Sequence, residues 1–224
     1  MATNKAKPAA RRRPSRKPRA PGRPGAASPD LRPQLLDAAI ACYARDGIKS
    51  ASLRAIAREA GVTPALLHYY FGDAAQLRQA VVDERVLPAI ASFRSTLPLD
   101  GEVSAVVASF VGGVGVLVAA HPWLPALWVR EVLCEGGALR GVILEKFASQ
   151  VPQALAAKFA QAQRDGMLNP DLDPRLLVVS MMGLTLFPAA SAPIWRSVFR
   201  ADDIDASALR AHTIALLDRG LGAG

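Results

Sequence analysis

The segment from Leu53 to Phe71, LRAIAREAGVTPALLHYYF, constrains the fold more than any other part of the chain. It contains two short runs with apolar residues at helical spacing, and Gly61 separates them. A glycine here permits the positive φ that a tight turn between two helices requires. Ala57 stands where the two helices would touch, and a larger side chain would push them apart. The segment therefore predicts a helix-turn-helix unit.

The residues at the helix starts favour the same interpretation. Ser52 offers an N-cap for a helix that begins at Leu53. Thr63 offers a second N-cap, and Pro64 suits the first helical position of a helix that ends at Phe71. The apolar side chains expected in the shared core are Ile56, Ala60, Val62 and Leu67.

The outward face of the second helix would carry rings and small groups but no acid. His68 and Tyr69 can form hydrogen bonds with phosphates and base edges without a formal charge. Ala65 and Leu66 can lie against thymine methyl groups. Such a face suits the major groove of DNA.

An ordinary helical hairpin would instead bury its aromatic run in a core. For Tyr70 and Phe71 we expect core positions, whereas for His68 and Tyr69 the complete turn pattern favours DNA contact.

The rest of the chain reads as helix, because Ala and Val are abundant and alternating strand-like runs are few. We expect Pro88 to stop one of the helices. We expect the segment FPAASAPIWRSVF, which starts at Phe187, to be a structured loop. The expected helices are 30–46, 53–60, 64–71, 74–87, 89–96, 102–120, 122–135, 138–165, 173–188 and 204–220.

The positive charge of the chain is concentrated at its start. Nine of the 27 Lys and Arg residues lie in residues 1–30, where Asp30 is the only acid, and the remaining chain is neutral. Residues 1–27 have almost nothing to bury, so we expect a disordered arm that binds polyanions.

The segment LLDAAIACYARDGIKSASLRAIAREAGVTPALLHYYFGDAAQL, from Leu35 to Leu77, resembles the N-terminal signature of the TetR family of transcriptional regulators. The resemblance implies an all-α protein with a three-helix DNA-binding domain at 28–73 and a helical domain at 74–224 for ligand binding and dimerisation. It also implies a cytoplasmic homodimeric repressor that binds pseudo-palindromic double-stranded DNA and releases it on binding a small molecule.

Carried over residue by residue, the resemblance makes Ser52 a phosphate contact and Thr63 the cap of the recognition helix. His68 stands where the family most often has Tyr, and Leu66 stands where Thr, Ala or Ser is common. Ala74 stands where the family commonly has a Lys that meets the DNA backbone. The full set of expected DNA-binding residues is Ser52, Arg54, Thr63, Pro64, Ala65, Leu66, His68, Tyr69, Arg19 and Arg23.

The arm offers a replacement for the missing lysine. Its Gly-Arg-Pro at Gly22 to Pro24 is similar to the core of an AT-hook, although Pro21 stands in place of the first Arg. A flexible cationic arm can follow phosphates or place Arg19 and Arg23 in a minor groove. An arm that does nothing remains an alternative.

An apolar stretch without charge runs from Val103 to Ala120, which reaches the lower limit for a membrane span. Gly112, Gly113 and Gly115 dilute it, and no aromatic belt or basic cluster flanks it. We expect no membrane span but a helix enclosed by others.

The second half offers residues for a ligand cavity, each of which could equally be plain core. They are Phe110, Trp123, Leu127, Trp128, Arg130, Phe147 and Met181. The polar groups that could orient a ligand are His121, Arg130, Glu131 and Arg140, although Arg130 and Glu131 could form a surface pair. This composition predicts an apolar or aromatic ligand, and the apolar run LLVVSMMGLTLF predicts dimerisation through the last two long helices.

Other classes of function fit less well. The chain lacks GxSxG, HExxH, GxxxxGK and a Gly-rich dinucleotide turn, so we expect no enzyme and no cofactor. Cys42 and Cys134 are far apart and form no metal-binding motif, which predicts two free thiols and no metal site. A nonspecific architectural DNA-binding protein, driven by the arm alone, is the other alternative.

Overall fold

The computed structural model describes residues 30–146 and 151–222. Within these ranges all regular structure is helical, which confirms the all-α prediction. The contacts of the chain divide it into the units Met1–Leu31 and Arg32–Gly224, and the finer boundary at residue 73 stays a prediction. The predicted arm, with Arg19 and Arg23, lies outside the described residues.

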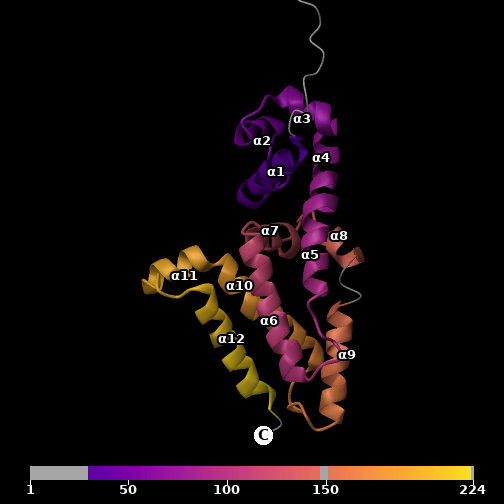
Figure 1. The fold of residues 1–224 in the computed structure, drawn as a ribbon, viewed down its shortest axis with the longest axis vertical. Helices are drawn as coiled ribbons and strands as arrows, with labels where there is room; N and C mark the ends of the chain where they lie inside the picture. The colour runs from indigo at the N-terminus through magenta and orange to yellow at the C-terminus, as the bar shows by residue number, and fades with distance from the viewer. Residues whose placement is uncertain (1–29, 147–150, 223–224) are drawn as a thin grey trace, which may run out of the picture. The chain divides into compact units, whose positions relative to one another are not determined.

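The first helices pack around α1 (Arg32–Asp46), which lies beside α2 (Leu53–Glu59), α3 (Pro64–Phe71) and α4 (Ala74–Val81) (Figure 1). One whole face of α1 is removed from solvent, with Leu35, Leu36, Ala39, Ile40 and Cys42 each at most 1% exposed. Burial of that many apolar side chains is the main stabilising term for this group of helices.

Pro88 does not stop the helix that begins at Ala74, so that prediction was wrong. The chain passes from α4 through a π-helical turn, η1 (Val82–Val86), into α5 (Leu87–Arg94). Pro88 falls in the first turn of α5, where its missing N–H costs little. The wider turn, closed by the bond from Leu87 N to Val82 O, lets the helical path continue.

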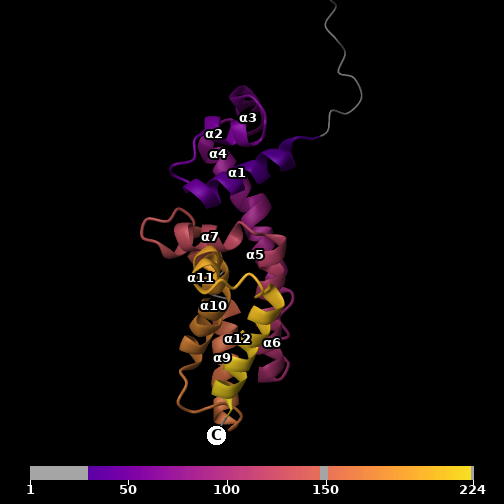
Figure 2. The same cartoon turned by 90° about the vertical axis from the view of Figure 1, so that its left-hand side faces the viewer.

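A second group of helices forms around α6 (Val103–Ala120), as Figures 1 and 2 show. Its core also contains α9 (Val151–Arg164), α10 (Pro174–Ala190) and α12 (Ala206–Leu221). Short helical pieces connect the two groups, namely α7 (Leu124–Trp128), the π-helical turn η2 (Val129–Leu133) and α8 (Arg140–Lys146).

The expectation that α6 is enclosed on all sides was wrong for the single chain. Val106, Phe110 and Val114 are buried, but Ala108 and Val116 are exposed, Val116 by 72%. By length and composition α6 is long and apolar enough to cross a membrane. α10 and α11 would be so only if taken together as one span, and they are bent by 70° relative to each other. The core helix of a globular bundle passes the same test.

The segment predicted as a structured loop contains a further helix, α11 (Ala192–Phe199). Pro188 lies inside α10, and Pro193 stands in the first turn of α11, where a proline is tolerated. The indole N–H of Trp195 donates to Pro188 O at 2.9 Å, which fixes the corner between the two helices. Pro193 therefore marks a helix start, whereas Pro188 is accommodated within the last turn of α10.

Both cysteines are free, as predicted. Cys42 lies on the buried face of α1, and this burial raises the pKa of its thiol. Cys134 is exposed.

Candidate functional site

The turn between α2 and α3 has the geometry that a helix-turn-helix requires. Gly61 adopts φ +68°, and a Cβ there would meet no atom within 4 Å, so the dihedral and not the space selects glycine. Ala57 is 1% exposed at the contact between the helices, and its carbonyl accepts from Val62 N at 2.9 Å. Ala60 O accepts from the side chain of Gln34, which ties the turn to α1.

Most of the predicted DNA-contacting side chains that the structure describes are exposed. Leu66 is half-buried, while the other described members are exposed. No acidic side chain lies within α3 itself. The exposed members are Ser52, Arg54, Thr63, Pro64, Ala65, His68 and Tyr69.

The two capping residues differ in what they leave for a ligand. Ser52 Oγ accepts from Ala55 N at 3.2 Å, so its hydroxyl hydrogen stays available as a donor. Thr63 has the extended backbone of an N-cap, but its side chain makes no capping bond. The expected cap at Thr63 is therefore positional only, and its hydroxyl can turn toward a phosphate.

His68 is tied to its own helix end. Its Nδ1 lies 2.6 Å from Gly72 O. A carbonyl only accepts, so Nδ1 carries the hydrogen and a neutral ring presents Nε2 as an acceptor. In this state His68 suits a base-edge donor better than a phosphate.

The three aromatic residues of α3 face different environments, as the sequence predicted. Tyr69 is 83% exposed, Tyr70 is half-buried against the core and Phe71 is buried. The rings of Tyr69 and Tyr70 meet edge to face, with centroids 5.5 Å apart. This contact supports the exposed ring of Tyr69 from one side.

The start of α4 carries a carboxylate and no basic side chain. Asp73 accepts from Ala75 N and Gln76 N, both at 2.8 Å, and so caps the helix. Ala74 is exposed at the first helical position. A DNA backbone at this helix end would meet no positive side chain from residues 72–76.

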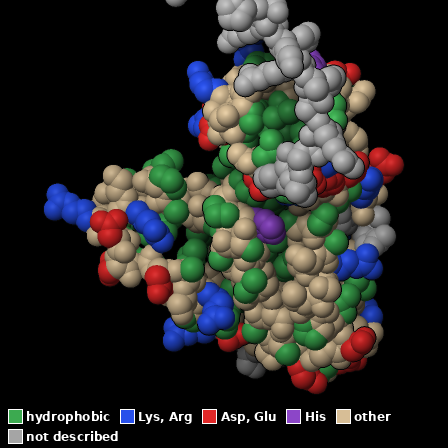
Figure 3. Space-filling view, turned by 45° about the horizontal axis from the view of Figure 1, so that its top comes forward, with side chains coloured by type: hydrophobic (Ala, Val, Ile, Leu, Met, Phe, Trp, Pro, Cys, Tyr) green, Lys and Arg blue, Asp and Glu red, His purple; other side chains and the backbone are tan. Residues whose placement is uncertain are grey.

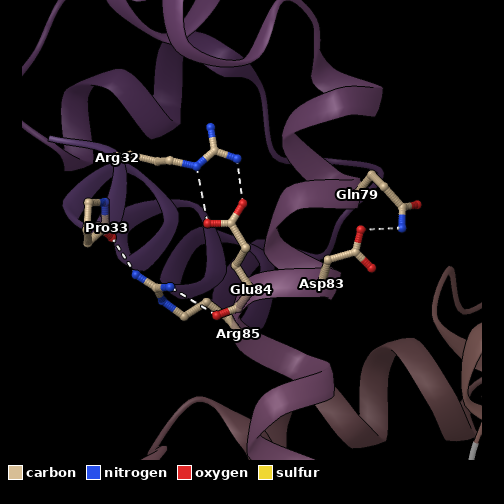
Figure 4. A network of polar contacts seen from close by, with 6 residues as sticks. All are labelled: Arg32, Pro33, Gln79, Asp83, Glu84 and Arg85. Carbon is tan, nitrogen blue, oxygen red and sulfur yellow. Dashed lines mark hydrogen bonds and ion pairs between the residues drawn. The ribbon is translucent and has the colours of Figure 1, made fainter. Parts of the chain in front are cut away.

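The N-terminal end of α1 is attached to η1 (Figure 4). Arg32 makes two hydrogen bonds with the carboxylate of Glu84, and they hold the pKa of Glu84 below its usual range. Arg85 donates to Pro33 O at 3.0 Å, as Figure 4 shows. It also donates to the Asp37 carboxylate at 2.6 Å. These bonds fix one end of the helix that carries the DNA-binding unit.

The C-terminal end of α1 is attached to η2 through Glu131, for which the predicted surface pair with Arg130 was wrong because its carboxylate is buried on backbone N–H groups. Glu131 is 5% exposed, and it accepts from Ile48 N at 2.8 Å and from Ala138 N at 3.0 Å. The guanidinium of Arg140 donates to the carbonyls of the same segment, among them Val132 O at 3.0 Å. Both residues hold backbone, and nothing in the sequence marked Glu131 as a buried acid.

An apolar cavity of about 380 Å³ lies beside the same segment. Among its described lining residues Arg94 is the only charged one, and Trp128 is the only other one with a side-chain N–H. The walls come from α5, α6, α7, η2, α8, α9 and α10. Val132 and Leu133 line it from η2 itself, and Trp128 lines it from the position just before η2.

The predicted lining differs from the observed one. Phe110 and Trp128 line this cavity. Leu127 is buried in the core around α1, against which Trp123 packs. Met181 is buried in the core around α6. Arg130 lies instead beside Gly47. Phe147 lies outside the described residues. A helical pattern identifies apolar residues but not which side of a helix faces a cavity.

A second hollow of about 230 Å³ lies between α6, α10, α11 and α12. Within the described residues, no group of three or more His, Cys, Asp or Glu side chains is arranged to hold a metal ion.

Comparison with known proteins adds the family context. Residues 35–81 match the family model described as "Bacterial regulatory proteins, tetR family". The nicotine-responsive transcriptional repressor HdnoR of Paenarthrobacter nicotinovorans is 49% identical over 55 residues, which are 25% of this chain and 28% of that repressor. The transcriptional regulator UidR of Escherichia coli is 25% identical over 158 residues, which cover 69% of this chain and 77% of UidR.

Solved structures share the fold at low identity. KstR2 of Mycobacterium tuberculosis, a ketosteroid transcriptional regulator, superimposes with a TM-score of 0.69 at 17% identity, covering 89% of this chain and 99% of that chain. FadR of Bacillus subtilis, solved in complex with stearoyl-CoA, gives a TM-score of 0.59 at 21% identity, with coverage of 84% and 97%. Both pair an N-terminal helix-turn-helix domain with a C-terminal helical domain.

Tyr69 and Tyr70 offer a matched test of the interface. Tyr69→Ala should lower affinity for specific DNA about tenfold through loss of a hydrogen bond to a base edge, with little change in stability. Tyr70→Ala should instead lower the free energy of unfolding by about 2 kcal/mol, because it leaves a cavity. Fluorescence anisotropy on labelled duplex and thermal unfolding separate the two effects, and equal behaviour of the two variants would contradict the assignment.

Proposed function

Because the chain belongs to the TetR family of bacterial regulatory proteins, we propose that it is a cytoplasmic, homodimeric repressor of transcription. It binds a pseudo-palindromic operator through α3 and leaves it when a small apolar molecule binds. The observation that carries this proposal is the outward face of α3, which is exposed, free of acids and held by a complete helix-turn-helix.

DNA contact divides between reading bases and holding phosphates. Ala65, Leu66, His68 and Tyr69 supply small, apolar and hydrogen-bonding groups for base edges, but no cation. Ser52 and Thr63 supply hydroxyl groups for the backbone. Much of the electrostatic attraction must then come from elsewhere, and the nine basic residues before Asp30 are the richest source of positive charge.

Dimerisation is supported by apolar side chains that face solvent in the single chain. On α10 these are Leu176, Val179 and Phe187, each at least 64% exposed, and Ile194 and Val198 continue them on α11. Figure 3 shows hydrophobic side chains at the surface of the part that holds α11 and α12. A patch of this kind marks an interaction site, and a second copy of the chain brings the same patch.

The effector site is the cavity beside η2. Its described walls offer almost no hydrogen-bonding group, so a ligand with buried polar atoms would leave them unpaired there. A largely hydrocarbon molecule avoids that cost, and the volume of about 380 Å³ lies in the range for small-molecule sites. The names of two structural relatives mention a ketosteroid and stearoyl-CoA, whose steroid nucleus and acyl chain are hydrocarbon.

Selection of bound duplexes from a random DNA pool, at near-physiological salt, tests the proposal. We expect enrichment of an inverted repeat whose half-sites lie about one helical turn apart, because each subunit of a dimer presents one α3. Light scattering of the complex should give at least two chains per duplex. Enrichment of no sequence would contradict the proposal and favour a nonspecific architectural protein.

Removal of the basic arm tests its share of the affinity. Deletion of residues 2–27 should weaken operator binding. It should also make the slope of log K against log salt concentration less negative, by about 0.9 for every phosphate that the arm neutralises. A control arm of the same length, with its nine Lys and Arg residues replaced by Gln, should behave like the deletion. An unchanged affinity and slope in both variants would show that the arm plays no part.

A further inference from the structure

The turn after α1 depends on an acceptor from far along the chain. Gly47 adopts φ +89° and its N–H donates to Tyr43 O, which closes the helix. Ile48 is 7% exposed, and its N–H has left the helical ladder, so it needs an acceptor within the protein. The carboxylate of Glu131, 83 positions away, provides it at 2.8 Å.

Glu131 binds both sides of one junction. Its Oε1 accepts from Ile48 N, and its Oε2 accepts from Ala138 N in the loop that follows η2. Bonds to an ionised acceptor are about twice as strong as those between neutral groups. Loss of the carboxylate would leave two N–H groups without an acceptor.

The packing around this junction leaves little free space. A Cβ on Gly47 would lie 3.3 Å from Arg130 Cδ, and a Cβ on Gly137 would collide with Glu131 O. Leu139 N donates to the same Glu131 O at 3.0 Å, so the loop folds back tightly onto η2. A displacement of η2 therefore moves the carboxylate and cannot be absorbed by a void.

Other residues of η2 and its start form part of the cavity wall. Trp128 and Val132 line the cavity, while Glu131 between them reaches the turn after α1. The stretch is a π-helical turn, closed by the bond from Cys134 N to Val129 O. Such turns are rare and occur frequently at functional sites.

We propose that Glu131 couples the cavity to DNA binding: its carboxylate holds the turn between α1 and α2 while the cavity is empty, and a molecule that displaces η2 weakens that hold. The inference rests on the proposed function and states how a molecule in its effector site would change DNA binding. Lys49 adds a second tie, from Nζ to Gly136 O at 2.9 Å. With the turn released, α2 and α3 lose the orientation in which two subunits fit one operator.

The test compares Glu131→Gln with Glu135→Gln, which removes the same charge from an exposed residue four positions later. The Gln side chain keeps one carbonyl oxygen that can accept from one backbone N–H. Its amide N–H₂ faces the other backbone N–H, and two donors cannot bond to each other. In Glu131→Gln we expect faster hydrogen exchange at the amides of Ile48 and Ala138, and about tenfold weaker binding to the selected inverted repeat. Glu135→Gln should match the unmodified protein in both measurements.

Dodecanoate serves as the probe of the cavity, because its hydrocarbon chain suits the apolar walls and its carboxylate can lie beside Arg94, the one charged side chain among the described lining residues. In the unmodified protein it should raise exchange at Ile48 and lower operator affinity about tenfold. In Glu131→Gln its addition should change operator affinity less than about twofold, because the coupling group is already gone. A Glu131→Gln protein that binds the operator with full affinity, or keeps the full response to dodecanoate, would overturn the proposal.

A milder variant covers the case in which Glu131→Gln fails to fold. Lys49→Met removes only the exposed second tie and should raise exchange at Ile48 by a smaller factor; unchanged exchange there would count against the coupling. If the unmodified protein selects no DNA site, the proposed function fails. Hydrogen exchange at Ile48 in the variants still reports on the contact between Glu131 and the turn after α1, because that measurement needs no DNA.

Discussion

The attachment of α1 at both ends is the constraint on which the rest of the structure depends. Its apolar face is buried against α2 and α4, so it carries the whole helix-turn-helix. Its N-terminal end is attached to η1 by Arg32 and Arg85, and its C-terminal turn is attached to η2 by Glu131. Both attachments are made at π-helical turns, where the backbone ladder is already irregular. The position of α3 is thus set by elements that belong to the rest of the bundle.

This arrangement explains how an interface almost without charge can serve a DNA-binding protein. The outward face of α3 presents Tyr69, His68 and small side chains, which discriminate between bases but add little long-range attraction. Asp73 even places a carboxylate at the start of α4. The proposed division of labour gives sequence recognition to a rigid helix and phosphate attraction to the basic residues before Asp30.

Local features of the fold were predictable from sequence and distant ones were not. Gly61, Ala57 and the capping positions Ser52 and Thr63 all lie within twenty residues, so local spacing was enough to predict the helix-turn-helix. Pro88 was read as a helix end, because a π-helical turn that accommodates a proline leaves no mark in the sequence. The cavity lining and the bond from Ile48 to Glu131 join segments far apart along the chain, and only three-dimensional packing brings them together.

Methylation interference on the selected duplex separates binding by α3 from binding by the arm, because dimethyl sulfate marks guanine N7 in the major groove and adenine N3 in the minor groove. We expect interference at major-groove guanines in two clusters about one helical turn apart, where two copies of α3 would lie. Tyr69→Ala should weaken both clusters equally. Interference confined to minor-groove adenines, with none in the major groove, would contradict binding by α3 and assign DNA binding to the arm alone.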